Sequence, residues 1–122
     1  MELIMKYFIN LSNHPSNKWD KKQYDAANAY GTVIDLPFPS VPATADEENI
    51  QSLVEEYIKT IQKYDNPVVM CQGEFTFSFM MINKLIDMGI KVVASCTERN
   101  TIEIDNKKIS EFEFVRFREY KK

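Results

Sequence analysis

The sequence is poor in the residues on which many known sites are built. Its 122 residues include three glycines, two cysteines and one histidine. The glycines form neither of the Gly-rich phosphate motifs, G-x-G-x-x-G or G-x-x-x-x-G-K-[ST]. A single histidine, with no H-x-x-x-H pattern and no clustered acidic triplet, gives no basis for a metal centre. We therefore expect a protein without a metal or another cofactor.

The small number of cysteines and the lack of long apolar runs indicate in which compartment the protein is expected. Cys71 and Cys96 fall at the ends of predicted core strands, where we expect reduced, buried thiols rather than a disulfide framework or a zinc site. Cys71 also lacks the histidine-paired, electropositive setting that a nucleophile needs. No apolar run approaches the ~18 residues of a transmembrane helix, and the N-terminus has no signal-peptide layout. These features predict a cytoplasmic protein that binds no membrane; Met5 offers a second start, which would make residues 1–4 an extension.

Length and charge favour one domain with a small ligand. A chain of 122 residues suits a single domain, residues 1–122, that buries roughly two-thirds of its unfolded surface. A net charge of −3 argues against a broad surface for duplex nucleic acid. It leaves room for one small anionic ligand held by local amides and a few arginines.

What the chain does contain is a complete strand–helix–strand unit at residues 68–99. Val68–Cys71 and Lys91–Cys96 are apolar, β-branched runs without strict alternation, which is typical of strands buried on both faces of a parallel sheet. The segment between them is apolar around most of a helical circumference. Gly89 follows it, where a left-handed C-terminal cap is expected.

The joint between the first of these strands and the helix, Gln72–Thr76, is its most informative part. Gly73 lets the backbone turn or approach a ligand, and Thr76 is a candidate helix cap. The unpaired N–H groups and positive dipole end of the helix then favour an anion. A plain strand-to-helix turn explains the same residues equally well.

Before this unit, the chain alternates strands and helices. Lys6–Leu11 and Thr32–Leu36 are predicted strands, with a helix between them that begins at a cap on Ser16 or Asn17 and ends at Gly31. A second helix follows a three-proline segment. Its apolar stripe repeats at intervals of three and four from Ile50 to Tyr64, and its predicted capping box is made by Thr44 and Glu47.

After Arg99 the pattern changes to a predicted antiparallel hairpin. Thr101–Ile104 and Ile109–Tyr120 are extended runs on either side of a polar turn at residues 105–108. The apolar parity switches near Phe114 and Val115, which indicates a bulge, a bend or burial of both faces. The aromatic hairpin also predicts apolar surface to spare and hence a homodimer.

These elements predict an α/β fold with a Rossmann-like parallel sheet of order 2-1-3-4 and a C-terminal antiparallel β-hairpin. Ligands of such sheets sit at the carboxyl edge, where the strand order reverses between strands one and three. Topology brings three polar loops to that edge. Their candidate ligand-binding residues are Ser12, Asn13, Gln72, Gly73, Thr76, Ser95, Thr97 and Arg99, and their candidate catalytic residues are His14 and Glu74.

Each of the three charged candidates has an alternative reading. His14 could be a general acid or base, or a solvent-exposed loop residue. Glu74 could be a base, or a carboxylate favoured by the helix N-terminus. Arg99 could clamp an anion, or pair with a neighbouring glutamate.

Three short segments resemble a minimal CARF-type Rossmann domain: F-I-N-L-S-N-H-P, G-E-F-T-F and A-S-C-T-E-R. The layout of nearly the whole chain is similar to small stand-alone CRISPR-associated proteins of that class. CARF domains bind cyclic oligoadenylate messengers across a homodimer, and ring nucleases among the small members linearise them. Family members often carry a Gly-Gly-Thr-like or Gly-Thr-Ser-like loop where this chain has Gly73–Thr76.

The resemblance implies a metal-independent ring nuclease of type III CRISPR signalling, which binds and cleaves a cyclic oligoadenylate. The amides of residues 73–76 and Arg99 would hold phosphates, and His14 would assist proton transfer while a ribose 2′-oxygen attacks its own phosphate. Two alternatives stay open. One is a sensor or sink that binds the ligand without cleaving it, and the other is a small nucleoside- or nucleotide-processing enzyme that uses Glu74.

Overall fold

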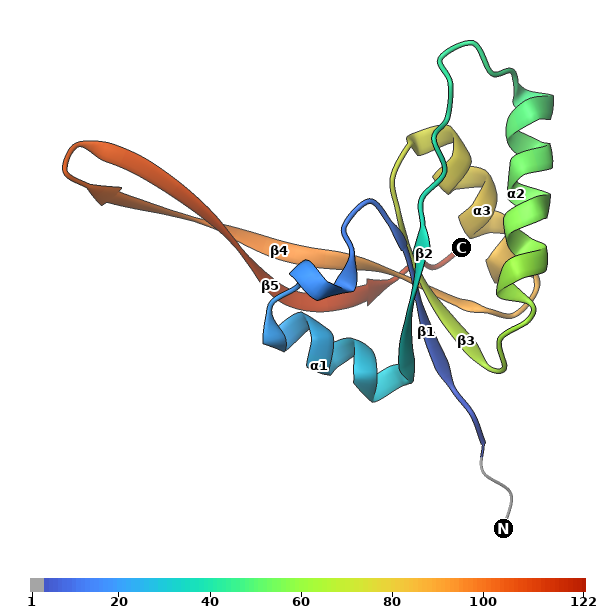
Figure 1. The fold of residues 1–122 in the computed structure, drawn as a ribbon, viewed down its shortest axis with the longest axis horizontal. Coiled ribbons are helices and arrows are strands. Elements are labelled where there is room, and N and C mark those ends of the chain that lie inside the picture. The colour runs from blue at the N-terminus through green and yellow to red at the C-terminus, as the bar shows by residue number, and fades with distance from the viewer. Residues whose placement is uncertain (1–3) are drawn as a thin grey trace.

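The computed structural model describes residues 4–122, so an N-terminal extension lies largely outside the described residues. The chain forms one five-stranded sheet with helices on both faces (Figure 1). Among residues 4–122, no helix is long and apolar enough to cross a membrane. The elements in chain order are β1 (Tyr7–Ser12), the 3-10 helix η1 (Ser16–Lys18), α1 (Lys21–Tyr30), β2 (Thr32–Pro37), α2 (Glu47–Ile61), β3 (Pro67–Gln72), α3 (Phe75–Asp87), β4 (Lys91–Ile104) and β5 (Lys107–Glu119).

The sheet has the order β2-β1-β3-β4-β5, with β5 antiparallel to β4 and the other pairs parallel. This confirms the predicted order 2-1-3-4 and the C-terminal hairpin, and it agrees with a Rossmann-like fold at the coarse level. The order reverses between β1 and β3, because β2 follows β1 on one side while β3 lies on the other.

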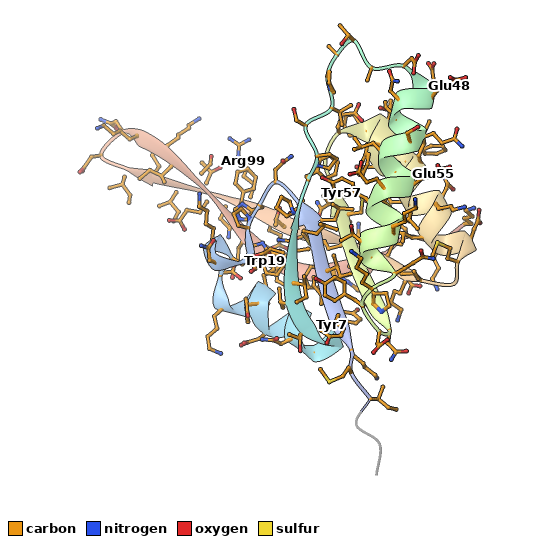
Figure 2. The ribbon with its side chains drawn as sticks, turned by 45° about the vertical axis from the view of Figure 1, so that its right-hand side comes forward. Tyr7, Trp19, Glu48, Glu55, Tyr57 and Arg99 are labelled. Carbon is orange, nitrogen blue, oxygen red and sulfur yellow. The ribbon has the colours of Figure 1, made fainter. Side chains whose placement is uncertain are left out.

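Each central strand buries both faces, as the uninterrupted apolar runs predict. In β1, Phe8 packs in the cluster beneath α1 and Ile9 packs in the larger cluster beneath α2 and α3. The stripe of α2 supplies four buried side chains to the larger cluster, while Glu48 and Glu55 lie on its outer side (Figure 2). The predicted stripe is therefore confirmed.

The predicted helix caps were wrong in detail. Asp20 caps α1 by accepting from the N–H of Gln23, because the short η1 turn intervenes after the predicted cap at Ser16 or Asn17. The capping box of α2 is made by Asp46 and Asn49, two residues beyond Thr44. The cap of α3 is Glu74 and not Thr76, because its longer side chain reaches the N–H of Phe77.

The hairpin is longer and its turn tighter than predicted. Asp105 and Asn106 alone connect the strands, with φ values of 50° and 63°. Two successive positive φ values are typical of the two-residue type I′ turn, which suits strand twist. Thr97 pairs with Phe114 while Cys96 pairs with Arg116, so Val115 is the extra residue of a bulge. The predicted bulge near Phe114–Val115 is confirmed.

Past this bulge the hairpin leaves the body of the molecule as a two-stranded arm (Figure 1). Residues 97–113, which we call the arm, are exposed throughout. Neither buried cluster of the described chain includes any of them.

Candidate functional site

A cleft with a volume of about 420 Å³ opens beside the carboxyl ends of β1 and β3. The parallel pairing of β3 with β4 ends at Met70 and Val93, and β4 then continues into the hairpin. The cleft lies on the α1 side, at the reversal point of the strand order. Six of the ten predicted site residues line it: Ser12, Asn13, His14, Gln72, Ser95 and Thr97.

The loop after β1 is fixed by a hydrogen-bond hub at the backbone carbonyl of His14. This oxygen accepts from Asn10 Nδ2 at 2.9 Å and from Trp19 Nε1 at 3.1 Å. Ser12 Oγ donates to Asn10 Oδ1 at 2.6 Å and accepts from the His14 N–H at 3.2 Å. The backbone at His14 is therefore held in one place, while its side chain stays exposed at the cleft.

Asn10 is the residue on which this network depends. Asn10 is 1% exposed within the apolar run Y-F-I-N-L, and a buried amide requires partners. Asn10 Nδ2 also donates to Asp35 Oδ1 at 2.9 Å, across the β1–β2 register. Asp35 in turn accepts from the N–H and hydroxyl of Ser16. We did not single out Asn10 or Asp35 from the sequence, although a lone amide inside the run Y-F-I-N-L is a usable signal.

Gln72 closes the gap where β3 and β4 separate. Its Oε1 accepts from the backbone N–H of Ser95, which the parallel ladder no longer reaches. Because buried N–H groups need acceptors, this contact keeps the diverging strands in register. Gln72 thus has a structural role and also presents its amide at the cleft.

The remaining walls of the cleft come from residues that sequence reasoning missed. Lys18 is the lysine of the lining, and Trp19 and Phe112 supply aromatic surface, with Phe112 69% exposed. These residues come from η1, the residue that follows it and β5 of the hairpin, so no local motif unites them. The further lining residues are Asp20, Gln23, Met70 and Phe114.

The structure does not bring the other four predicted residues to this cleft. A Cβ on Gly73 would lie 2.4 Å from the ring of Phe38, so this glycine makes room for an aromatic side chain instead of lining the cleft. Arg99 lies on the arm, apart from Trp19 in Figure 2, and donates to Ser110 Oγ at 3.0 Å. The expected meeting of His14, Gly73, Glu74, Thr76 and Arg99 in one cleft was therefore wrong.

Glu74 and Thr76 line a second pocket, between the N-terminal ends of α2 and α3. The Glu74 carboxylate accepts from the Phe77 N–H and from the Thr76 hydroxyl, both at 2.7 Å. These hydrogen bonds lower the pKa of Glu74 below its ordinary value. The hydrogen bonds of this carboxylate are therefore made at the N-terminal end of α3. The other charged residues of this pocket, Asp46 and Glu47, are acidic too, so it does not suit an anion.

The cysteines and the acidic groups offer no further chemistry at the cleft. Burial raises the pKa of Cys71 to about 11, so its thiol is protonated at neutral pH. Cys96 is only half-buried, less than predicted, and both thiols are free. Among residues 4–122, no three His, Cys, Asp or Glu side chains gather in a way that could hold a metal ion.

Comparison with known proteins gives one match. A family model described as "Uncharacterized protein MJ1673 family" matches residues 6–118. No curated protein and no solved structure matches the chain. The match covers all the strands and helices described above except Glu119, the last residue of β5.

Proposed function

The chain belongs to the uncharacterized MJ1673 family, and we propose that it binds and cleaves a cyclic oligoadenylate at the cleft beside β1 and β3. The observation that carries the proposal is the meeting of six polar predicted residues with Lys18 and aromatic walls at one sheet edge. Open α/β sheets bind ligands at this position. The CARF-like character of the domain, inferred from short motifs, belongs to the same proposal.

The chemistry of the lining suits a nucleotide unit. Phe112, which is 69% exposed, offers a face on which an adenine could stack, and Trp19 adds only the small part of its ring that is not buried. Amides and hydroxyls of Asn13, Gln72 and Thr97 suit the base edge and the ribose. Lys18 supplies a cation for a phosphate, and charge-assisted hydrogen bonds are the strong ones. A volume of about 420 Å³ lies within the usual range of small-molecule sites.

In the proposed cleavage, the substrate provides its own nucleophile. A ribose 2′-oxygen attacks the adjacent phosphorus, the bond from phosphorus to the 5′-oxygen breaks, and a 2′,3′-cyclic phosphate and a 5′-hydroxyl result. His14 is the candidate that takes the proton from the 2′-hydroxyl or returns one to the departing 5′-oxygen. Lys18 stabilises the charge on the phosphoryl oxygens, and the fixed β1 loop keeps the reacting groups in line.

Binding without cleavage is the second candidate, and one observation favours it. Within the described chain, the hydrogen bonds of His14 involve its backbone N–H and carbonyl, and none orients the imidazole. An efficient general base is normally held by a second group. A sink or sensor would need the same cleft without that orientation. The geometry is less favourable to a nucleoside-processing enzyme built on Glu74, since that carboxylate caps α3.

The test is incubation of the purified protein with cyclic tri-, tetra- and hexa-adenylate in EDTA, with the products separated by chromatography. We expect cleavage of one ring size to linear products. His14→Ala should retain the ligand and slow cleavage by about 10²–10⁴-fold, which is the usual contribution of acid–base catalysis. Lys18→Ala should weaken binding about tenfold or more, because it removes a charge-assisted contact.

Lys22→Ala is the matched control, since Lys22 is an exposed lysine of α1 outside the cleft lining. It should leave binding and cleavage unchanged. A retained, intact ring would support the sink or sensor. If no ring size binds, or if Lys22→Ala and Lys18→Ala behave alike, the cleft is not the site and the proposal fails.

A further inference from the structure

The arm carries an apolar patch that its own chain leaves uncovered. Ile102, Ile104 and Ile109 are 44%, 51% and 44% exposed. Ile102 and Ile109 are register partners, and Ile104 lies two residues along the same strand, so all three share one face. We call this the Ile face. An isolated two-stranded hairpin is at best marginally stable in water, so an exposed apolar face on such an arm indicates a partner.

Two charged residues of this face flank Ile109 on β5, and two further acids, Glu98 and Glu113, lie one row farther inward. Going outward from the Ile102–Ile109 row, the next row pairs Ile104 with Lys107; going inward, it pairs Asn100 with Glu111. On β5 a cation and an anion therefore stand two residues to either side of Ile109. Lys107 and Glu111 are both exposed, and neither forms an ion pair within residues 4–122.

We propose that the Ile face docks on the Ile face of a second copy of this chain, with the two arms antiparallel. The two-fold axis would run across the arm at the Ile102–Ile109 row. This operation lays Lys107 of each chain over Glu111 of the other, stacks Ile102 and Ile109 on their counterparts, and places Ile104 over Asn100. A two-fold interface needs such a self-complementary patch, in which each contact occurs twice.

Two features of β5 favour docking through the Ile face over other ways of pairing. The free edge of β5 carries Lys108, Arg116 and Arg118, and charged edges discourage strand-to-strand addition. Phe112 lies on the opposite face of the arm, as its pairing with Arg99 shows, and it lines the cleft. Docking through the Ile face therefore leaves the cleft open, and it does not depend on nucleotide binding.

Sedimentation of the full-length protein over a micromolar concentration series, without nucleotide, tests the proposal. We expect particles of twice the 14.3 kDa mass of one chain. Lys107→Glu and Glu111→Lys should each raise the dimer Kd at least about tenfold, because each places like charges opposite one another twice. An equimolar mixture of these two variants should dimerise again, since both mixed pairs then have opposite signs.

The matched control is Lys108→Glu, the same charge change one residue away on the opposite face, which should leave the Kd unchanged. Ile109→Asp is a second disrupting variant, and circular dichroism confirms that each exposed substitution preserves the fold. Recovery in the mixture supports the proposed register. A wild-type particle of 14.3 kDa at every concentration, equal effects of Lys107→Glu and Lys108→Glu, or no recovery on mixing would each overturn it.

Discussion

The sequence allows two roles for Glu74, a catalytic base or a helix cap, and the structure supports the helix cap. Its position after a buried strand suits a catalytic base, and its position before a helix suits a cap. The structure has it accept from the Phe77 N–H and the Thr76 hydroxyl, which lowers its pKa. A carboxylate whose pKa falls on folding stabilises the folded state above its ordinary pKa, and that contribution disappears as the pH falls through the folded value.

Glu74→Gln should therefore reduce stability at neutral pH and lose its effect in acid. Above pH 4.5, the ordinary value, the charged cap is present in the wild type and absent in the variant. Below the folded pKa both side chains are neutral and the two unfolding midpoints should converge. Urea denaturation at several pH values measures this. Glu55→Gln, on the exposed face of α2, is the control. A difference that does not shrink as the pH is lowered below 4.5 would contradict the assignment.

At the scale of elements, the junction between α1 and β2 depends on a close backbone contact. Gly31 ends α1, and Thr32 starts β2 by donating to the Lys6 carbonyl at 3.0 Å. A Cβ on Gly31 would lie 2.5 Å from that carbonyl group and 2.7 Å from the nitrogen of Tyr7. A glycine is required here because the backbone of Lys6 and Tyr7 lies so close. Its φ of 163° does not require glycine, because this is ordinary extended backbone.

Gly31→Ala should destabilise the protein by about 1–3 kcal/mol, the usual cost of overpacking. The neighbours are backbone atoms of Lys6 and Tyr7 at the start of β1, so they cannot move aside without disturbing the sheet. Chemical denaturation gives the change in free energy of unfolding. Thr32→Ala, at an exposed neighbouring position, should change it by less than about 0.5 kcal/mol. An equal effect of the two substitutions would show that the junction tolerates a side chain.

At the scale of the whole molecule, the body and the arm have separate sources of stability. Both buried clusters lie in the body, on either face of the central strands. The arm begins at the Val115 bulge and adds ladder hydrogen bonds without adding buried side chains. The cleft lies where body and arm meet, so its lining combines Phe112 and Phe114 of the hairpin with residues 12–14 and 18–19 of the body.

Replacing residues 101–110 by Asn-Gly should leave the body folded. The new two-residue turn joins Asn100 to Glu111, which are register partners. Asn100 lies an even number of residues before Ile104, so this pair has the same position in the hydrogen-bond pattern as Ile104 and Lys107, which flank the natural turn. We expect a Tm within about 5 °C of the full chain, because no buried cluster loses a residue. The shortened chain should also lose the proposed dimer. A collapse of the Tm would show instead that the arm is part of the cooperative unit.

Much of the architecture could be predicted from the sequence, because its signals are local. Apolar runs without alternation specify buried parallel strands, and the stripe from Ile50 specifies α2. The parity switch near Val115 locates the bulge, since the side-chain period of a strand is two. Gly89, with a φ of 77°, ends α3 where the left-handed cap was predicted. The strand order then brings the β1 and β3 loops to one edge.

Which residues share a site was decided by the tertiary structure. Whether Glu74 faces the cleft depends on the side of the sheet at which α3 begins, and no local pattern specifies that side. The strand was predicted to end at Cys96, just before Arg99, yet β4 continues eight positions past Cys96 to Ile104 and carries Arg99 outward on the arm. Conversely, Lys18 and Phe112 meet across the cleft because η1 and β5 converge in space, although they are far apart in the sequence. Contacts between distant segments depend on how the helices pack on the sheet. The apolar pattern of a single sequence indicates which residues are buried, but it does not indicate which distant residues they contact.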